Sequence, residues 1–190
     1  MKKIQLATIL AATMILGGCA EQVALVTGPD KKMTTTIEEH TFTQAAKDEL
    51  SHAKRLGLIS GDESTAKVAD VFEKRGGYTV SLDRTTVATD KLLVAERKSE
   101  LIKQCKVNKN DLALILYSTN VSKGSVAEQA TIGRSTIQDR WTIDMLVCRN
   151  KRSMSFSALV VTSGSIYVSG DENRKVGESL ASAILTEVGK

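Results

Sequence analysis

Hydrophobic and polar residues alternate most regularly in the last third of the chain. Bulky apolar side chains recur at every second position through Trp141–Cys148 and again through Met154–Val160. A period of two is typical of strands with one buried face. The basic run Arg149–Arg152 separates them, so we predict a hairpin with a basic turn. A second turn at Gly164-Ser165 and a short strand over Ile166–Val168 then complete a β-meander.

Two other segments have the pattern of strands. Tyr78–Leu82 alternates, with Tyr78, Val80 and Leu82 on one face. Leu112–Tyr117 is apolar without interruption, which favours a central strand covered on both faces. Residues 118–138 lack bulky apolar side chains, so we expect a long polar connection there.

Helical spacing appears before the first of these strands. Thr41 and Gln44 match a capping box, and apolar residues then follow at intervals of four or three up to Ala53, which predicts a helix that closes near Gly57. A turn at Ser60–Glu63 leads to a second amphipathic helix, which Arg75-Gly76-Gly77 ends.

Two more helices are predicted further along the chain. The segment from about Thr89 to Gln104 is rich in helix formers, although its run Leu92–Ala95 also suits a strand, and we favour a helix. The tetrapeptide Ser169–Glu172 resembles the turn at Ser60–Glu63. After it, an apolar residue recurs every four positions from Val176 to Val188, which predicts a closing helix.

These elements indicate an α+β fold. We expect a largely antiparallel sheet with a C-terminal β-meander, two N-terminal helices and a closing C-terminal helix. Residues 37–190 are long enough to form one domain with its own core. Residues 19–36 have no sustained period, and we interpret them as a tether with one edge strand at most.

The composition argues against nucleic acid as a partner. Lys and Arg exceed Asp and Glu by only 4 in the full chain, and by 2 once Lys2 and Lys3 are left out. Aromatic residues make up 4% of the chain, which is too few for a platform that stacks bases or sugars.

The first eighteen residues have the features of a secretory signal. Lys2 and Lys3 precede an apolar run from Ile4 to Leu16, which is too short to span a bilayer comfortably. The run ends in Leu16-Gly17-Gly18-Cys19, which resembles the lipobox of bacterial lipoproteins. This resemblance covers residues 1–20 only.

The resemblance implies how the mature protein is held. In this family the signal is cut before the cysteine, whose sulfur carries diacylglycerol and whose new amino group is usually acylated, commonly with palmitate. Cys19 would therefore anchor a mature chain of 172 residues, the 190 of the full chain minus 18. Two or more acyl chains anchor a protein stably. Asp after the cysteine tends to retain such proteins in the inner membrane, so Ala20 implies the outer membrane of a Gram-negative cell, with the domain facing the periplasm.

If Cys19 carries lipid, Cys105 and Cys148 remain as a pair in an oxidising compartment. A disulfide between them would stabilise the domain by about 3–4 kcal/mol on chain-entropy arithmetic. Two buried free thiols are the alternative. A redox role is disfavoured because neither cysteine belongs to a C-x-x-C motif.

The sequence contains no recognisable catalytic set. It has no G-x-S-x-G elbow, no glycine-rich phosphate loop and no HExxH motif, so we predict neither an enzyme nor a cofactor. Asp48 and His52 lie one helical turn apart, a spacing found in metal sites, but further ligands are lacking and we predict no metal.

Exposed cations offer the most plausible contact surfaces. Lys123, in the polar connection, and Arg149, Lys151 and Arg152, in the basic turn, are the candidate binding residues. We therefore expect a lipid-anchored, non-catalytic protein that binds a protein partner within an envelope assembly, such as a secretion, transfer or outer-membrane machine. The alternative is a module that binds a small molecule or a cell-wall fragment, or less plausibly a hydrolase.

Overall fold

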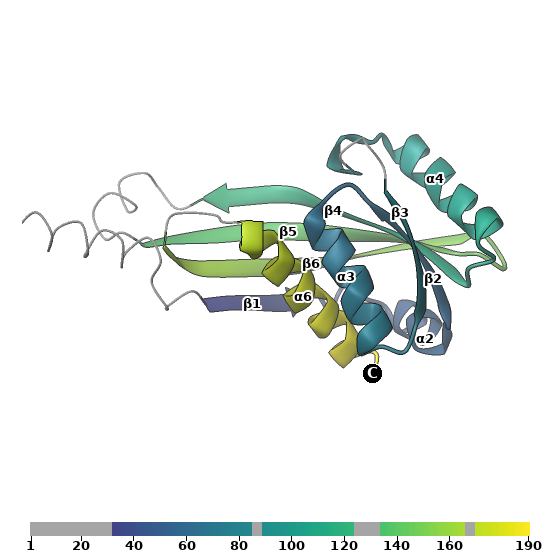
Figure 1. The fold of residues 1–190 in the computed structure, drawn as a ribbon, viewed down its shortest axis with the longest axis horizontal. Coiled ribbons are helices and arrows are strands. Elements are labelled where there is room, and N and C mark those ends of the chain that lie inside the picture. Colours follow the sequence, from purple (N-terminus) through teal and green to yellow (C-terminus); the bar gives the residue numbers. More distant parts are fainter. Residues whose placement is uncertain (1–31, 85–88, 124–133, 166–169) are drawn as a thin grey trace, which may run out of the picture. The chain divides into compact units, whose positions relative to one another are not determined.

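The structure is a computed structural model that describes residues 32–84, 89–123, 134–165 and 170–190. Figure 1 shows its elements. In chain order they are β1 (Lys32–Ile37), α2 (Gln44–His52), β2 (Arg55–Ser60), α3 (Glu63–Lys74), β3 (Thr79–Arg84), the 3-10 helix η1 (Thr89–Lys91), α4 (Val94–Val107), β4 (Leu112–Lys123), β5 (Arg134–Val147), β6 (Arg152–Ser165) and α6 (Gly170–Glu187).

The chain divides into two compact units. One comprises Met33–Ser122, Gln138–Val161 and Val168–Lys190, and it contains both hydrophobic clusters of the protein. The other comprises Met1–Lys32, Lys123–Ile137 and Thr162–Tyr167. The described residues of this second unit all belong to strands.

The six strands form one mixed sheet in the order β1-β6-β5-β4-β2-β3. Strand β2 is parallel to both β3 and β4, with Leu56 opposite Val80 on one side and Leu112 on the other. The fold is therefore broadly α+β, as expected, but the sheet is mixed and not purely antiparallel. The difference arises because β2, α3 and β3 form a parallel crossover unit, and the sequence pattern predicts no strand between the first two helices.

Strand β2 was missed because Gly57 was interpreted as the stop of a helix. In the structure α2 already ends at His52, and Leu56, Gly57 and Leu58 are buried strand residues. Any Cβ at position 57 would collide with the side-chain amide of Asn110, so glycine is required here by close packing and not by a turn.

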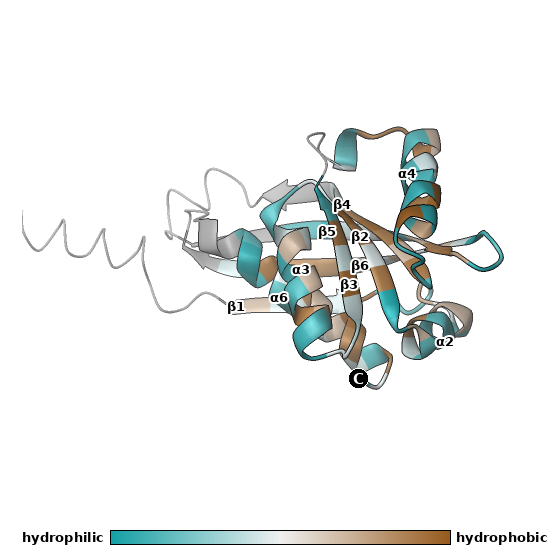
Figure 2. Cartoon of the chain, turned by 45° about the vertical axis from the view of Figure 1, so that its right-hand side comes forward, coloured by the Kyte–Doolittle hydropathy of each residue, from teal (hydrophilic) through white to brown (hydrophobic). Residues whose placement is uncertain are grey.

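Helices cover both faces of the sheet around β4, as Figures 1 and 2 show. Leu112, Leu114 and Leu116 join the larger cluster with residues of α2, α3 and α6. Ala113, Ile115 and Tyr117 join the smaller cluster with Leu101 and Cys105 of α4. The prediction of a central strand covered on both faces is confirmed.

The helix starts differ in detail from the predicted ones. The capping box at Thr41 and Gln44 is wrong, because the Thr43 hydroxyl caps α2 by accepting a hydrogen bond from the Ala46 N–H at 3.4 Å. The Thr41 hydroxyl instead donates to the Glu38 carbonyl at 2.7 Å and accepts from the Ser157 N–H at 2.9 Å. Helix α3 begins as expected after its turn, with the Asp62 carboxylate accepting from the Thr65 N–H at 2.7 Å.

The predicted helix from Thr89 to Gln104 is in fact η1 followed by α4, which starts at Val94 and continues to Val107. The predicted polar connection is also too long, because β4 continues to Lys123 and β5 begins at Arg134. The turn predicted at Gly164-Ser165 is wrong, since β6 includes both residues. The strand predicted over 166–168 lies outside the described residues.

Helices α3 and α6 pack closely against each other at Gly177. A Cβ atom there would lie far inside van der Waals contact with the backbone oxygen of Ser64. Since the obstacle is backbone, it cannot rotate away as a flexible side chain would.

We predict that Gly177→Ala destabilises the protein. In an open helix this change stabilises by about 0.5–1 kcal/mol, whereas overpacking costs about 1–3 kcal/mol, so the sign of the effect reports the contact. Urea unfolding of the variant and of the exposed control Lys175→Ala measures it. A gain in stability for Gly177→Ala would show that the two helices are not in close contact.

Candidate functional site

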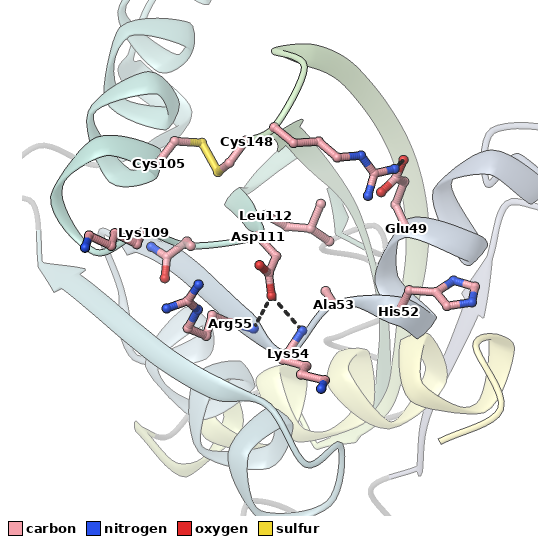
Figure 3. Close-up of a pocket in the computed structure, with 12 residues that line it drawn as sticks. Glu49, His52, Ala53, Lys54, Arg55, Cys105, Lys109, Asp111, Leu112 and Cys148 are labelled. Atoms are coloured by element: carbon pink, nitrogen blue, oxygen red, sulfur yellow. Dashed lines mark hydrogen bonds and ion pairs between the residues drawn. A yellow bond between two sulfur atoms is a disulfide. The ribbon is translucent and has the colours of Figure 1, made fainter.

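A cleft of about 500 Å³ opens where β2 and β4 begin. Its walls come from the end of α2, the start of β2, the segment between α4 and β4, and the end of β5 (Figure 3). We call it the basic cleft, because Lys54, Arg55, Lys109 and Arg149 line it against only two carboxylates, Glu49 and Asp111.

Asp111 holds the centre of the basic cleft together. One oxygen of its carboxylate accepts hydrogen bonds from the backbone N–H groups of Lys54 and Arg55, each at 2.9 Å (Figure 3). Its own N–H donates to the Arg55 carbonyl at 2.9 Å. Burial alone would raise the pKa of Asp111, but the two N–H donors, with the positive charges of Arg55 and Lys54, hold that pKa below its usual value.

The other carboxylate, Glu49, is paired with Arg149. The distance from Arg149 Nη2 to Glu49 Oε1 is 2.5 Å, and the pair connects α2 to the turn between β5 and β6. By contrast Lys54, Arg55 and Lys109 are exposed and form no ion pair with any side chain that the structure describes. The cleft therefore carries an uncompensated positive charge.

A disulfide forms one wall. Cys105 of α4 is joined to Cys148, which directly follows β5, across a Cα–Cα distance of 5.3 Å and a separation of 43 residues. This is the pairing expected from the sequence. The Cys148 N–H also donates to the Asp111 carbonyl at 2.9 Å, so the disulfide and the centre of the cleft are directly connected.

The candidate binding residues are only partly brought together. Arg149 lines the basic cleft. Lys151 and Arg152 lie next to it on the turn but do not line it: Lys151 Nζ donates to the Cys148 carbonyl at 3.0 Å, and an Arg152 guanidinium nitrogen lies 3.3 Å from the Met154 sulfur. Cys19 and the side chain of Lys123 lie outside the described residues.

Three cations of the cleft, Lys54, Arg55 and Lys109, were missed at the sequence level. They come from segments more than fifty residues apart, which only the parallel pairing of β2 with β4 brings together. With Leu56–Ile59 recognised as a strand, charged residues at the start of two buried strands would indicate a binding site at that end of the sheet.

The Asp48 and His52 pair does not form a metal site. The Asp48 carboxylate accepts from the Gln44 side-chain amide at 2.7 Å, and the His52 ring nitrogen Nδ1 lies 2.7 Å from the Asp48 backbone oxygen. Within residues 32–84, 89–123, 134–165 and 170–190, no three His, Cys, Asp or Glu side chains are placed to hold a metal ion. In the same ranges, no helix is both long and apolar enough to cross a membrane.

Two other hollows are weaker candidates. One of about 210 Å³ beside Trp141 is smaller than most small-molecule sites. Another, of about 600 Å³, is lined by four cations and three carboxylates, among which Asp70 accepts from Lys67 at 2.9 Å and contacts Lys74 at 2.6 Å, and these two bonds lower its pKa. Neither has the charge excess of the basic cleft.

No protein-family profile matches the chain, and no curated protein matches it in sequence. Solved structures that it resembles include the PelC dodecamer from Paraburkholderia phytofirmans, at 10% identity and a TM-score of 0.46, covering 83% of this chain and 96% of that one. They also include the lipoprotein GNA1162 from Neisseria meningitidis, at 14% identity and a TM-score of 0.41, covering 72% and 98%. The hypothetical protein CT253 from Chlamydia trachomatis follows at 6% identity and a TM-score of 0.44, covering 73% and 100%. Functional inference therefore depends on this chain's own residues.

We predict that removing the disulfide destabilises the protein by about 3–4 kcal/mol, because it closes a loop of more than forty residues in the unfolded chain. The double variant Cys105→Ser with Cys148→Ser, and wild type treated with a reductant, should lose similar stability in denaturant unfolding. Two titratable thiols in these positions of the non-reduced protein would contradict the prediction.

We predict that Asp111→Asn lowers stability by about 1–2 kcal/mol at neutral pH, since it weakens two hydrogen bonds to a charged acceptor. The folded-state pKa of Asp111 is lowered, so its contribution is present above the unfolded-state pKa near 3.8 and is lost as pH falls through the folded-state value. The difference between variant and wild type in urea unfolding should thus shrink below about pH 4. A difference that stays constant down to acid pH would exclude this role.

Proposed function

We propose that the chain is a lipid-anchored, non-catalytic protein on the periplasmic face of a Gram-negative outer membrane. It binds a protein partner through the basic cleft, as a component or accessory of an envelope assembly. The observation that carries the proposal is the cleft itself: a hollow of about 500 Å³ with four cations and only two carboxylates.

The anchor rests on the first twenty residues. Leu16-Gly17-Gly18-Cys19 after a short apolar run resembles a lipobox, and Ala20 favours the outer membrane. The disulfide between Cys105 and Cys148 fits the same compartment, because disulfides persist in the oxidising periplasm and are rare in the cytosol.

A binding role is preferred to catalysis because the carboxylates of the cleft already have structural partners. Asp111 is bound by two backbone N–H groups and Glu49 by Arg149. A general base must be free to reach a proton on the substrate, and its pKa is usually raised toward neutrality. The pKa of Asp111 is shifted the other way.

The test is cross-linking of the full chain in its native membrane. We expect wild type to enter the outer-membrane fraction and to give a discrete protein adduct, and Cys19→Ser to lose both the lipid and most of the adduct, because the anchor keeps the protein close to its partner. Mass spectrometry of the mature protein provides the control for lipidation. An intact Met1, an unmodified Cys19 thiol, or recovery of the monomer alone would contradict the proposal.

A further inference from the structure

The geometry of the basic cleft points to an acidic, extended segment of the partner polypeptide as its ligand, with Glu49 acting as an internal competitor for Arg149. This inference rests on the proposed function and specifies the chemistry of the same site. Three features support this inference: the end of the cleft at Arg149, the opposite end at Arg55 and Lys109, and the mostly uncharged lining between them.

At one end Arg149 is engaged but not enclosed. Its side chain is 70% exposed, whereas that of Glu49 is only 12% exposed. A guanidinium has five N–H donors, and one carboxylate contact leaves several of them for a second acceptor. An incoming carboxylate can thus share Arg149 with Glu49 through the remaining N–H donors, while the negative charge of Glu49 opposes its approach.

At the other end the cations have no such partner. Figure 3 shows Arg55 and Lys109 on the side of the cleft opposite Glu49, the partner of Arg149, with Asp111 between the two ends. Lys109 follows α4 in the left-handed region, with φ of 50°. The Asp111 carboxylate accepts hydrogen bonds from two backbone N–H groups and attracts Arg55 without forming an ion pair with it, so the cations at this end still outnumber the carboxylates.

The lining between these ends is mostly uncharged. Besides Asp111 it includes Ala53, Leu112 and the wall formed by the Cys105–Cys148 bridge. A ligand that uses both ends needs at least two acidic groups with an apolar part between them. An extended peptide with an acidic residue at position i, an apolar residue at i+2 and a second acidic residue at i+4 meets this requirement, because alternate side chains lie on the same side. A single phosphate or lipid headgroup contacts one end only.

The experiment measures binding of a fluorescein-labelled peptide, Glu-Ser-Leu-Ser-Glu, to the oxidised full-length chain by fluorescence anisotropy. Gln-Ser-Leu-Ser-Gln is the matched uncharged peptide. We expect binding of the acidic peptide alone, and weaker binding at about 200 mM than at about 50 mM salt, because exposed charges are screened.

The decisive variant is Glu49→Gln. Removing the competitor should tighten binding of the acidic peptide by about three- to tenfold. The matched control is Glu178→Gln, which breaks another Arg–Glu pair, Arg75 with Glu178 at 2.7 Å, outside the cleft. It should leave the affinity unchanged. If Glu49→Gln has no effect or weakens binding, Glu49 is not a competitor and the inference fails.

The cations are tested with neutral replacements that avoid placing a new charge beside Asp111. Arg55→Gln and Lys109→Gln should each weaken binding by about fivefold or more, while Lys98→Gln, an exposed lysine on α4 outside the cleft, should not. Circular dichroism and urea unfolding identify any variant that has lost its fold. In that case the remaining cation variant and Glu49→Gln still decide the result.

Two competitors distinguish an acidic peptide from a small anion or an anionic lipid as the ligand. Inorganic phosphate and vesicles that contain phosphatidylglycerol should displace the peptide only at concentrations where salt of equal ionic strength does the same. If either displaces it specifically, and Arg55→Gln abolishes that effect, the ligand is a small anion or a lipid and the inference is overturned.

The cross-linking assay separates this inference from the proposed function. If Arg55→Gln with Lys109→Gln loses the native adduct, both stand. If that double variant keeps the adduct, the chain binds a partner elsewhere and the cleft assignment is wrong. If the peptide results are as expected but wild type gives no adduct, the cleft assignment stands and the proposed function is wrong.

Discussion

The paired hydrogen bonds from Lys54 and Arg55 to the Asp111 carboxylate are the constraint on which the site depends. They join Lys54 and Arg55, at the start of β2, to Asp111, which directly precedes β4. The register that follows places Leu56 beside Leu112. Parallel strands cannot be joined by a tight turn, so their relative position must be set by packing and by contacts of this kind. The same two bonds that align β2 with β4 also fix the backbone from which Lys54 and Arg55 project. The same contact therefore aligns two strands of the core and positions two positively charged side chains.

Helix α4 is held against the sheet beside the basic cleft by a different kind of contact. Its contact with the sheet includes buried amides as well as apolar side chains: Gln104 and Asn110 are almost fully buried, and Asn110 Nδ2 donates to the Gln104 carbonyl at 3.1 Å and to Ser81 Oγ at 3.0 Å. Gly57 leaves the space that this polar contact occupies. Buried amides need their partners in place, because an unpaired one costs the desolvation that it does not recover. The disulfide fits this arrangement, since it holds the end of α4 at the sheet while the amides remain paired.

Hydrophobic periodicity was sufficient to predict those elements whose pattern of burial is visible within a single segment. The unbroken run of β4, the four-residue spacing of α6 and the basic turn after β5 could all be predicted, because each pattern lies within one segment. Strand β2 could not, since a six-residue strand containing Gly57 has the same local appearance as a helix end followed by a turn. The basic cleft depends on that strand and on its pairing with β4, so three of its four cations were invisible to any local pattern. Arg149 was identified only because the turn that carries it is itself a strong signal.

For the proposed binding role, the local charge of the basic cleft matters more than the net charge of the chain. The chain carries few excess cations, and several of those elsewhere on the described surface are paired, as Lys67 and Lys74 are with Asp70. In the basic cleft, four cations face two carboxylates, and the central one accepts its hydrogen bonds from backbone N–H groups. Exposed cations at a rim mainly increase the rate of encounter and give modest affinity. With the anchor proposed at Cys19, modest affinity is enough, because confinement to one membrane raises the effective concentration of any partner held at the same surface. In the proposed function the basic cleft and the lipid anchor are therefore complementary: the cleft would select the partner, and the anchor would raise its local concentration enough for a weak interaction to persist.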